Sequence, residues 1–338
     1  MFIVENHPLL TFNSFAIKVK AKYFTSVHSI NEIAEVVNKN NKEFNESLLI
    51  LGGGSNILFT KDFNGWVLKN ELKGIELIKE DEHYFYIKAM AGENWHQFVQ
   101  YCVDHNYAGV ENLSLIPGNI GASPMQNIGA YGVEIKDVFV ELEAYHIADQ
   151  QLVTFTKSDC NFGYRESIFK TNYKNQFIIT SVCFRLQKKP TYNTTYGAIE
   201  KELELMKVST PSIQSISAAV IRIRQSKLPD PVKIGNAGSF FKNPVIPQSQ
   251  FEALKLAFPS IPSFPNNHLV KLPAGWLIEQ CGWKGYRKND AGCYPLQALV
   301  LVNYGKATGA EIFELSQKII DSVKTKFGIE LEREVNII

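Results

Sequence analysis

The chain has 338 residues, which is enough for two or three domains of ~100–200 residues each. It is 45% hydrophobic and 20% charged, as is typical of globular proteins, and its formal net charge is +1. This balance excludes a strongly basic nucleic-acid-binding surface and a polybasic membrane-binding tail, so a few placed cations must hold any anionic ligand.

The N-terminal part of the chain alternates helix and strand signals. Apolar residues recur every three to four positions from Ser29 to Val37 and from Glu93 to Asp104, which predicts two amphipathic helices. Leu48–Leu51 is predicted to be a short buried strand that runs directly into the glycine-rich segment Gly52–Asn56. A further strand is predicted from Tyr84 to Ala91.

A long segment without clear periodicity follows, from Asn112 to Gly132. It is rich in Gly, Pro, Ser and Asn, but it is too apolar for disorder, and an irregular loop of about 20 residues within a compact domain is usually functional when it is ordered. Strands are predicted at about 137–147, 152–156 and 177–187. Residues 188–198 are polar and are predicted to form an exposed loop.

The C-terminal part begins after an amphipathic helix predicted from Ser212 to Arg224. Prolines in Lys227–Pro231 end this helix and form a natural hinge between domains. The remaining predicted elements are a helix at Ala274–Cys281, a strand at Ala298–Val302, a helix at Glu311–Phe327 capped by Gly328, and a strand at Ile329–Val335.

Three segments of small residues carry the candidate chemistry. Gly52–Asn56 could bind an anion through its consecutive backbone N–H groups, although a tight turn between strands is the simpler alternative. Ile116–Gly132 could press its backbone against a diphosphate and an aromatic ring system, or pack against a neighbouring strand. Gly235–Pro244 could present the hydroxyl of Ser239 at a fixed place, or form an ordinary tight loop.

The charged candidates are less specific by themselves. Arg165, in the turn Phe162–Ser167, carries a planar guanidinium suited to a carboxylate or phosphate, although an isolated arginine in a turn is usually solvated. Glu330, Glu332 and Glu334 would share one face of the predicted last strand. Their spacing does not single out one of the three.

Histidine and cysteine usage points away from metals and disulfides. The seven histidines show no metal-ligand spacing, and the five cysteines are scattered without a CxxC pair, which predicts no metal site and reduced thiols. The start of the chain lacks the pattern of a secretion signal, and its apolar runs are far shorter than a membrane span of ~18 residues. We therefore expect a cytoplasmic protein.

Five segments in this order resemble the UDP-N-acetylenolpyruvoylglucosamine reductase family. They are Gly52–Asn56, Ile116–Gly132, Phe162–Ser167, Lys227–Pro231 and Gly235–Pro244, within a likeness that extends from the Phe12–Phe15 segment to Val335. Each motif alone is moderately specific, and the five in order are highly specific. The family consists of flavoenzymes that make UDP-N-acetylmuramate for bacterial peptidoglycan, and so serve cell-wall synthesis, cell shape and cell division.

The resemblance implies an α+β fold with a two-part FAD-binding region of the vanillyl-alcohol-oxidase (PCMH) type and a C-terminal α+β substrate-binding domain. The implied parts are residues 1–70 joined by the final strand 329–338, then residues 71–225, and then residues 226–328. Neither glycine-rich segment contains His or Cys, so we predict that FAD is bound non-covalently. The matching FAD positions are Gly52, Gly53, Gly54, Ser55, Asn56, Pro117, Gly118, Gly121, Ala122, Ser123, Asn127, Gly129, Ala130, Tyr131 and Gly132.

The implied reaction is the NADPH-dependent reduction of UDP-N-acetylglucosamine enolpyruvate. By motif match, Ser239 is the proton donor, and Arg165 and Glu334 stabilise charge on the substrate carboxylate. The implied substrate contacts are Tyr164, Tyr196, Lys227, Asn243 and Gln297. Retention of the loop around Tyr196 resembles the subtype whose tyrosine loop closes over the substrate. We expect a monomer with no nucleic-acid or membrane partner.

Two departures from the family pattern and two alternative functions remain. Phe12–Phe15 stands where relatives usually carry Asn-Thr-Phe, and the turn at Arg287–Asp290 is also altered. Another flavoenzyme of this fold, such as an alcohol or sugar oxidase, would have no reason to keep Gly235–Pro244 together with Lys227. A nucleotide-binding regulatory module without turnover would not need an acidic hydroxyl and an arginine.

Overall fold

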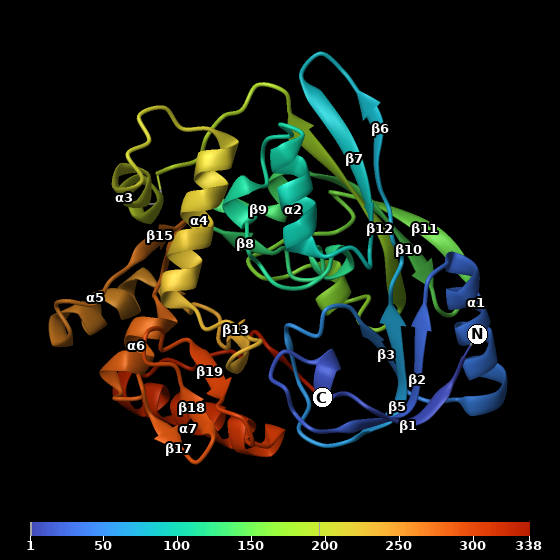
Figure 1. Ribbon diagram of the computed structural model, residues 1–338. Coiled ribbons are helices and arrows are strands. Elements are labelled where there is room, and N and C mark those ends of the chain that lie inside the picture. Colours follow the sequence, from blue (N-terminus) through green and yellow to red (C-terminus); the bar gives the residue numbers. More distant parts are fainter. Residues whose placement is uncertain (1, 196) are drawn as a thin grey trace. The chain divides into compact units, whose positions relative to one another are not determined.

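The computed structural model describes residues 2–195 and 197–338, and the chain forms two compact units (Figure 1). The first unit consists of Met1–His7, Ala21–Gly53 and Asn64–Ser226. The second consists of Pro8–Lys20, Gly54–Phe63 and Lys227–Ile338, so two short N-terminal segments fold with the C-terminal part. The α+β class is confirmed. The predicted division at residues 70 and 71 stays a prediction.

The first unit contains a five-stranded antiparallel sheet in the order β11-β10-β12-β7-β6. Helix α2 (Trp95–Asp104) packs its apolar side against this sheet, where Trp95 and Phe98 contact Phe184 in one hydrophobic core. The predicted elements in this region are confirmed to within a few residues. The strands are β6 (Ile75–Glu80), β7 (Tyr84–Met90), β10 (Phe139–His146), β11 (Gln151–Thr156) and β12 (Phe177–Gln187).

A second, four-stranded sheet of this unit has the order β1-β2-β5-β3. Helix α1 (Ile30–Lys39) begins where the Ser29 hydroxyl accepts a hydrogen bond from the Glu32 N–H, and it buries Ile33 and Val36 in a core that includes Trp66. The predicted helix and the strand β3 are confirmed, whereas β1, β2 and β5 were not predicted. The strands are β1 (Val4–Pro8), β2 (Lys20–Val27), β3 (Leu48–Leu51) and β5 (Phe63–Asn70).

The segment from Asn112 to Gly132 is mostly irregular, as predicted, apart from short 3₁₀ turns and the small hairpin of β8 (Gly129–Ala130) and β9 (Val133–Glu134). Residues 188–195 form no helix or strand, as predicted, but a helix that was not predicted, α3 (Gly197–Leu205), takes in the last two residues of the predicted loop. Helix α3 shares a hydrophobic core with α4 (Ile213–Lys227), which confirms the predicted amphipathic helix there.

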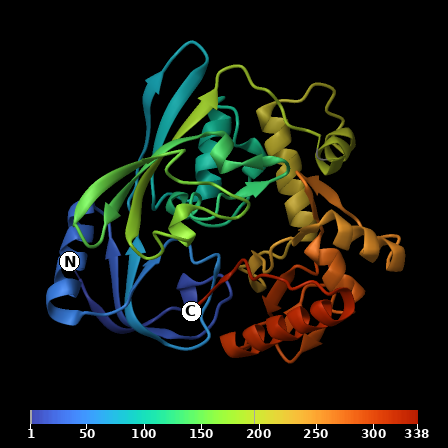
Figure 2. The same cartoon turned by 180° about the vertical axis from the view of Figure 1, so that it is seen from behind.

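The second unit is built on an antiparallel sheet in the order β13-β19-β18-β17. The long helix α7 (Gly309–Phe327) packs on β18 and β19, and it is seen in red in Figure 2. Helix α7 begins with a capping box between Thr308 and Glu311 and ends at Gly328, whose φ of 66° is the left-handed conformation expected of a C-terminal cap. The strands are β13 (Gly235–Ser239), β17 (Arg287–Lys288), β18 (Ala291–Cys293) and β19 (Val300–Asn303).

A smaller three-stranded sheet in the order β14-β16-β15 completes the C-terminal part of this unit. Its strands alternate along the chain with two short helices. The elements are β14 (Val245–Pro247), α5 (Gln248–Ala257), β15 (Phe264–Asn266), β16 (Leu269–Lys271) and α6 (Ala274–Gln280). None of the described helices is both long enough and apolar enough to cross a membrane.

The strand predicted at Ile329–Val335 is wrong in its position. The extended chain there buries Ile329, Leu331 and Val335, which explains the alternating pattern. It lies beside no continuous strand, and its pairing is limited to an isolated bridge between Phe241 and Arg333. The final strand is instead β20 (Asn336–Ile337), which runs parallel to β4 (Ile57–Leu58) in the same unit.

Candidate active site

The two glycine-rich segments lie against each other in the first unit. A Cβ atom placed on Gly53 would lie only 2.9 Å from the Cα atom of Gly118 and 3.0 Å from Oδ1 of Asn119. Gly52 faces the same asparagine, because its Cβ would lie 3.6 Å from that of Asn119. A residue with a side chain at position 53 would push the segments apart. The fold therefore brings together two segments that are far apart in the sequence.

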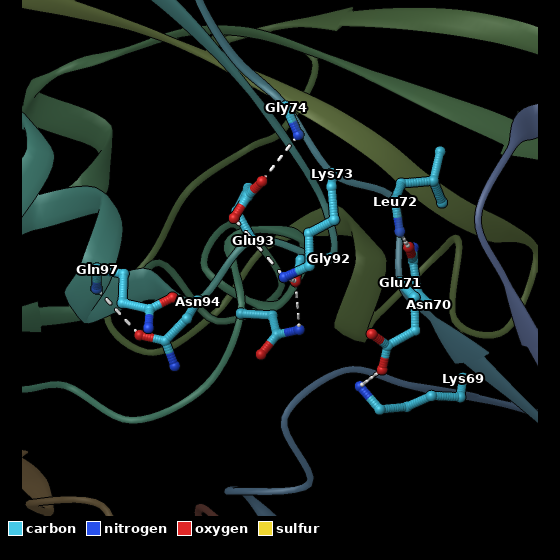
Figure 3. A network of polar contacts seen from close by, with 11 residues as sticks. Lys69, Asn70, Glu71, Leu72, Lys73, Gly74, Gly92, Glu93, Asn94 and Gln97 are labelled. Atoms are coloured by element: carbon cyan, nitrogen blue, oxygen red, sulfur yellow. Dashed lines mark hydrogen bonds and ion pairs between the residues drawn. The ribbon is translucent and has the colours of Figure 1, made fainter.

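Asn119 is in turn fixed by a polar network around Gly92 (Figure 3). The Asn119 side chain donates to the Gly92 carbonyl at 3.0 Å, and the Lys73 ammonium donates to the same oxygen at 2.6 Å. Glu93 pairs with Lys73 at 3.6 Å and accepts a hydrogen bond from the Gly74 N–H at 2.8 Å. This network holds the base of the second glycine-rich segment in one position.

The remaining part of the first glycine-rich segment belongs to the second unit. Gly54 has a φ of 63°, and a Cβ atom there would lie 2.0 Å from the Phe12 carbonyl oxygen, so only glycine fits. The Ser14 N–H donates to the Gly54 carbonyl at 3.0 Å. The Ser14 hydroxyl oxygen is buried and has no hydrogen-bond partner among the described residues. A buried hydroxyl of this kind is what a bound ligand would satisfy.

Asn127 organises the end of the second glycine-rich segment. It is fully buried, with a φ of 43°, and its amide donates to the Gly163 carbonyl at 2.9 Å and to the Glu134 carboxylate at 3.0 Å. Its side-chain oxygen accepts from the Lys136 N–H at 3.1 Å. Because both ends of the amide are used within the protein, Asn127 shapes the segment and joins it to the turn that carries Arg165.

Arg165 lies against that same segment. Its Nη2 donates to the Gly129 carbonyl at 2.6 Å, and a Cβ atom on Gly129 would lie 3.1 Å from its Nη1. The guanidinium also stands over the Tyr164 ring, 5.5 Å from the ring centroid. Arg165 has a φ of 55°, an unusual value for a residue with a side chain. The turn thus holds the arginine in a costly backbone conformation, as often happens at functional sites.

Ser239 lies at the exposed end of β13 in the second unit. The turn before it is shaped by Asn236, whose side-chain oxygen accepts from the Gly238 N–H at 2.9 Å while its amide donates to the Pro229 carbonyl at 3.2 Å. Gly238 has a φ of 70°. The sequence analysis did not single out Asn236, although an asparagine two residues before a glycine is the signal of such a turn.

Glu334 lies beside this turn through the main chain. Its N–H donates to the Phe240 carbonyl at 2.8 Å, one residue beyond Ser239. The side chain of Glu334 is partly buried. The fold therefore brings Glu334 next to the residue that follows Ser239, although the two predicted catalytic residues are far apart in the sequence.

The two other glutamates of this segment have surface partners. Glu330 pairs with Lys324 at 2.8 Å, and Glu332 pairs with Lys242 at 2.5 Å. Both carboxylates are exposed. The structure therefore distinguishes three residues that the sequence pattern left equivalent.

The predicted substrate contacts do not all lie in one place. The side-chain oxygen of Asn243 accepts a hydrogen bond from the Ala274 N–H at 2.9 Å. The Oε1 atom of Gln297 lies near Gly275, 3.0 Å from the position that a Cβ atom would take there. Both side chains therefore lie at the start of α6 in the second unit. Lys227 is exposed at the end of α4, and Tyr196 lies outside the described residues. Among the residues described, no cluster of His, Cys, Asp and Glu is arranged to hold a metal ion.

Comparisons with known proteins agree with these observations. Residues 230–338 match the family model of the UDP-N-acetylenolpyruvoylglucosamine reductase C-terminal domain, and residues 21–156 match that of an FAD binding domain. The UDP-N-acetylenolpyruvoylglucosamine reductases of Flavobacterium johnsoniae and Amoebophilus asiaticus are 52% and 51% identical, each over the full length of both chains. The crystal structure of the enzyme from Thermus caldophilus has the same fold, with a TM-score of 0.69 at 22% identity, over 99% of this chain and 98% of that one.

Proposed function

Because this chain belongs to the UDP-N-acetylenolpyruvoylglucosamine reductase family, we propose that it reduces UDP-N-acetylglucosamine enolpyruvate to UDP-N-acetylmuramate with NADPH. It is an FAD-containing oxidoreductase of peptidoglycan synthesis. The observation that carries this conclusion is 52% identity over the whole of both chains, which leaves no part of the relative unmatched. A monomeric, cytoplasmic enzyme of the tyrosine-loop subtype is part of the same proposal.

The residues present fit FAD. The close approach of Gly53 to Gly118 leaves no room for a side chain at position 53, so the main chains of the two segments are in contact there. Backbone N–H groups of such segments suit a diphosphate, because they form an anion-binding concavity. When bound, FAD supplies the ring that accepts a hydride from NADPH and passes it to the enolpyruvyl group. Neither segment offers a His or Cys for a covalent bond, so we infer dissociable FAD.

Arg165 would bind the carboxylate of the enolpyruvyl group. Hydride addition to an electron-rich enol ether is feasible only when charge can flow into the conjugated carboxylate. A guanidinium suits this task because its planar fork matches a carboxylate. The hydrogen bond to Gly129 supports this role, since it fixes the orientation of the guanidinium before substrate binds.

Ser239 would then donate a proton to the neighbouring carbon. A hydroxyl is a weak acid, but an enolate is a strong enough base to take its proton when the geometry is fixed. The turn built on Asn236 supports this assignment, because it holds the serine at an exposed strand end. We assign to Glu334 the role of stabilising charge on the substrate carboxylate together with Arg165, because Glu332 is engaged by Lys242 on the surface.

An anaerobic titration tests the proposal. The purified protein should be yellow, should bleach with NADPH, and should regain its colour when UDP-N-acetylglucosamine enolpyruvate is added. Omission of the enolpyruvyl substrate is the control and should leave the protein bleached. A colourless protein, or colour that returns with air but not with this substrate, would reject the function and favour a regulatory module or an oxidase respectively.

A further inference from the structure

Two asparagines join the polar loop at residues 188–195 to the end of the second glycine-rich segment. Asn193 lies in this loop, and its side-chain amide donates to the Gly132 carbonyl at 3.0 Å. Asn112, at the start of the glycine-rich segment, donates to the Asn193 carbonyl at 2.8 Å and to the Tyr131 carbonyl at 3.0 Å. These bonds connect parts of the first unit that are 61 and 81 positions apart in the chain.

The main chain of the glycine-rich segment is shaped to receive Asn193. Tyr131 and Gly132 both have a positive φ, of 49° and 80°. A Cβ atom on Gly132 would lie only 2.9 Å from Nδ2 of Asn193, so the close approach of this amide requires glycine at position 132. The Oδ1 atom of Asn193 accepts a hydrogen bond from the Thr195 hydroxyl at 3.1 Å. Both ends of the Asn193 side chain are therefore used within the protein.

The polar loop depends on such side-chain bonds for its position. Residues 188–195 form no helix or strand, and none of these eight residues is fully buried. The start of the loop is held by Lys188, whose ammonium pairs with Glu80 at 2.9 Å. The part nearer α3 is held by Asn193, and its partner Asn112 is rigidly placed because it is only 1% exposed. A loop with so little packing opens more easily than a core element unless specific bonds hold it.

The chain is attached to the same place again just after the loop. Helix α3 begins at Gly197 and buries Ile199 in the hydrophobic cluster that it forms with α4. Tyr131 packs on this cluster as well. Tyr131 and Gly132 are thus a common base for two attachments of the chain, one before and one after position 196, which itself lies outside the described residues.

We propose that Asn193 is a positioning residue for the enolpyruvyl substrate, acting through the loop that carries Tyr196. This inference rests on the proposed function, in which Tyr196 contacts the substrate while Tyr131 and Gly132 contact FAD. The bond from Asn193 to Gly132 then fixes the substrate-contacting loop against the flavin-contacting segment. Because the loop is already held, less conformational entropy is lost when substrate binds, and the substrate is placed relative to the cofactor that reduces it.

Variants at Asn193 test the proposal with the FAD-loaded protein. Asn193→Ala removes the side-chain bonds, whereas Asn193→Asp keeps the shape of the side chain and loses only the N–H that donates to the Gly132 carbonyl. Thr191→Ala is the matched control at an exposed position of the same loop. Three quantities are measured: the amide hydrogen exchange of residues 188–195 by mass spectrometry, the dissociation constant for UDP-N-acetylglucosamine enolpyruvate from flavin absorbance, and kcat at saturating substrate.

Asn193→Ala should speed hydrogen exchange in the loop and raise the dissociation constant for substrate, each by about three- to tenfold, as expected for the loss of one hydrogen bond. Its kcat should stay within about twofold of the wild type, because Asn193 takes no part in hydride or proton transfer. Asn193→Asp should change the same two quantities at least as much, and Thr191→Ala should leave all three within about twofold. Exchange and substrate binding like those of the wild type in both Asn193 variants would overturn the proposal.

A double-mutant cycle with Tyr196→Phe separates positioning from a general loosening of the protein. If Asn193 acts through Tyr196, adding Asn193→Ala to Tyr196→Phe should raise the dissociation constant by less than about twofold. Persistence of the full effect in that background would contradict the proposal. Wild-type protein without turnover of the enolpyruvyl substrate would reject the proposed function and the positioning role with it. Normal turnover in the wild type, together with unchanged exchange in Asn193→Ala, would reject the positioning role alone.

Discussion

The Nη2 atom of Arg165 donates a 2.6 Å hydrogen bond to the main-chain oxygen of Gly129, a residue 36 positions earlier in the chain. This bond joins the turn that carries the arginine to the second glycine-rich segment. It uses one N–H of the guanidinium, and together with the Tyr164 ring beneath it this bond sets the orientation of the guanidinium plane. Arginine and lysine are therefore not equivalent here, because an ammonium has no plane to orient.

Arg165→Lys should lower kcat/KM for the enolpyruvyl substrate by about 10²–10³, since one preorganised donor to a developing oxyanion has that effect. The reoxidation of reduced FAD by substrate, followed by stopped-flow absorbance, measures it. Arg222→Lys is the control, because Arg222 is a surface residue paired with Glu202. Turnover like that of the wild type in Arg165→Lys would remove Arg165 from the mechanism.

Ser239→Ala should leave reduction of FAD by NADPH unchanged and slow reoxidation by substrate by about 10²–10⁴, the range for a positioned general acid. Ser239 is exposed at the end of β13, so removing its hydroxyl should not disturb the fold. The two half-reactions are measured separately under anaerobic conditions. Equal loss of both would indicate damage to the protein and contradict a role as proton donor.

Gly53→Ala should weaken FAD binding by about tenfold or more, because the new Cβ atom would lie 2.9 Å from the Gly118 Cα atom and force the two segments apart. Gly197→Ala is the control, since its Cβ would meet no atom within 4 Å. Fluorescence of FAD released on dilution gives the affinity. Equal FAD affinity in the two variants would show that the contact between the segments does not shape the cofactor site.

The cysteines should react slowly with a thiol reagent at a pH of about 8. All five are free, and burial raises the pKa of Cys160 to about 12, of Cys183 to about 11 and of Cys293 to about 12. These groups stay protonated at that pH, and Cys102 is also buried. Cys281 is the one partly exposed thiol among them. Mass spectrometry after brief alkylation should find at most Cys281 modified, and rapid labelling of the others would contradict the buried assignment.

Glu111 gives a pH dependence with a defined sign. Burial raises its pKa above the ordinary value, against the opposing hydrogen bond from the Gly109 N–H at 2.6 Å. The folded protein therefore holds this proton more tightly than the unfolded chain does. The resulting stabilisation is present at low pH and is lost as pH rises through the folded-state pKa.

Glu111→Gln should remove this dependence, because the amide keeps an acceptor and never ionises. The melting temperature of the variant minus that of the wild type should increase as pH rises through the folded-state pKa of Glu111, because only the wild type then carries a buried charge. Differential scanning calorimetry of both proteins over a series of pH values measures this difference. A difference that is constant or decreases with pH would show that Glu111 is not a buried, destabilised carboxylate.

The sequence patterns that succeeded were those with a strong local period. Helices α1, α2, α4 and α7 each carry an apolar stripe long enough to define a helical repeat, and α1 and α7 also have recognisable capping residues. Strands β1, β2 and β5 lacked an alternation clear enough to recognise; β5 buries four consecutive residues, Gly65–Leu68. The alternation at Ile329–Val335 correctly predicted which residues are buried. It did not predict a strand correctly, because a strand also needs a continuous neighbour to pair with.

By itself, the sequence determined the family, the FAD-binding class and the segments that matter, because these depend on residue types in a fixed order along the chain. Only the tertiary structure decided that Gly53 lies against Gly118, and that Lys242 engages Glu332 while the Glu334 N–H is hydrogen-bonded to the Phe240 carbonyl. Periodicity encodes whether a residue is buried. The identity of its distant neighbour depends on how whole elements pack, and one stretch of sequence does not contain that information.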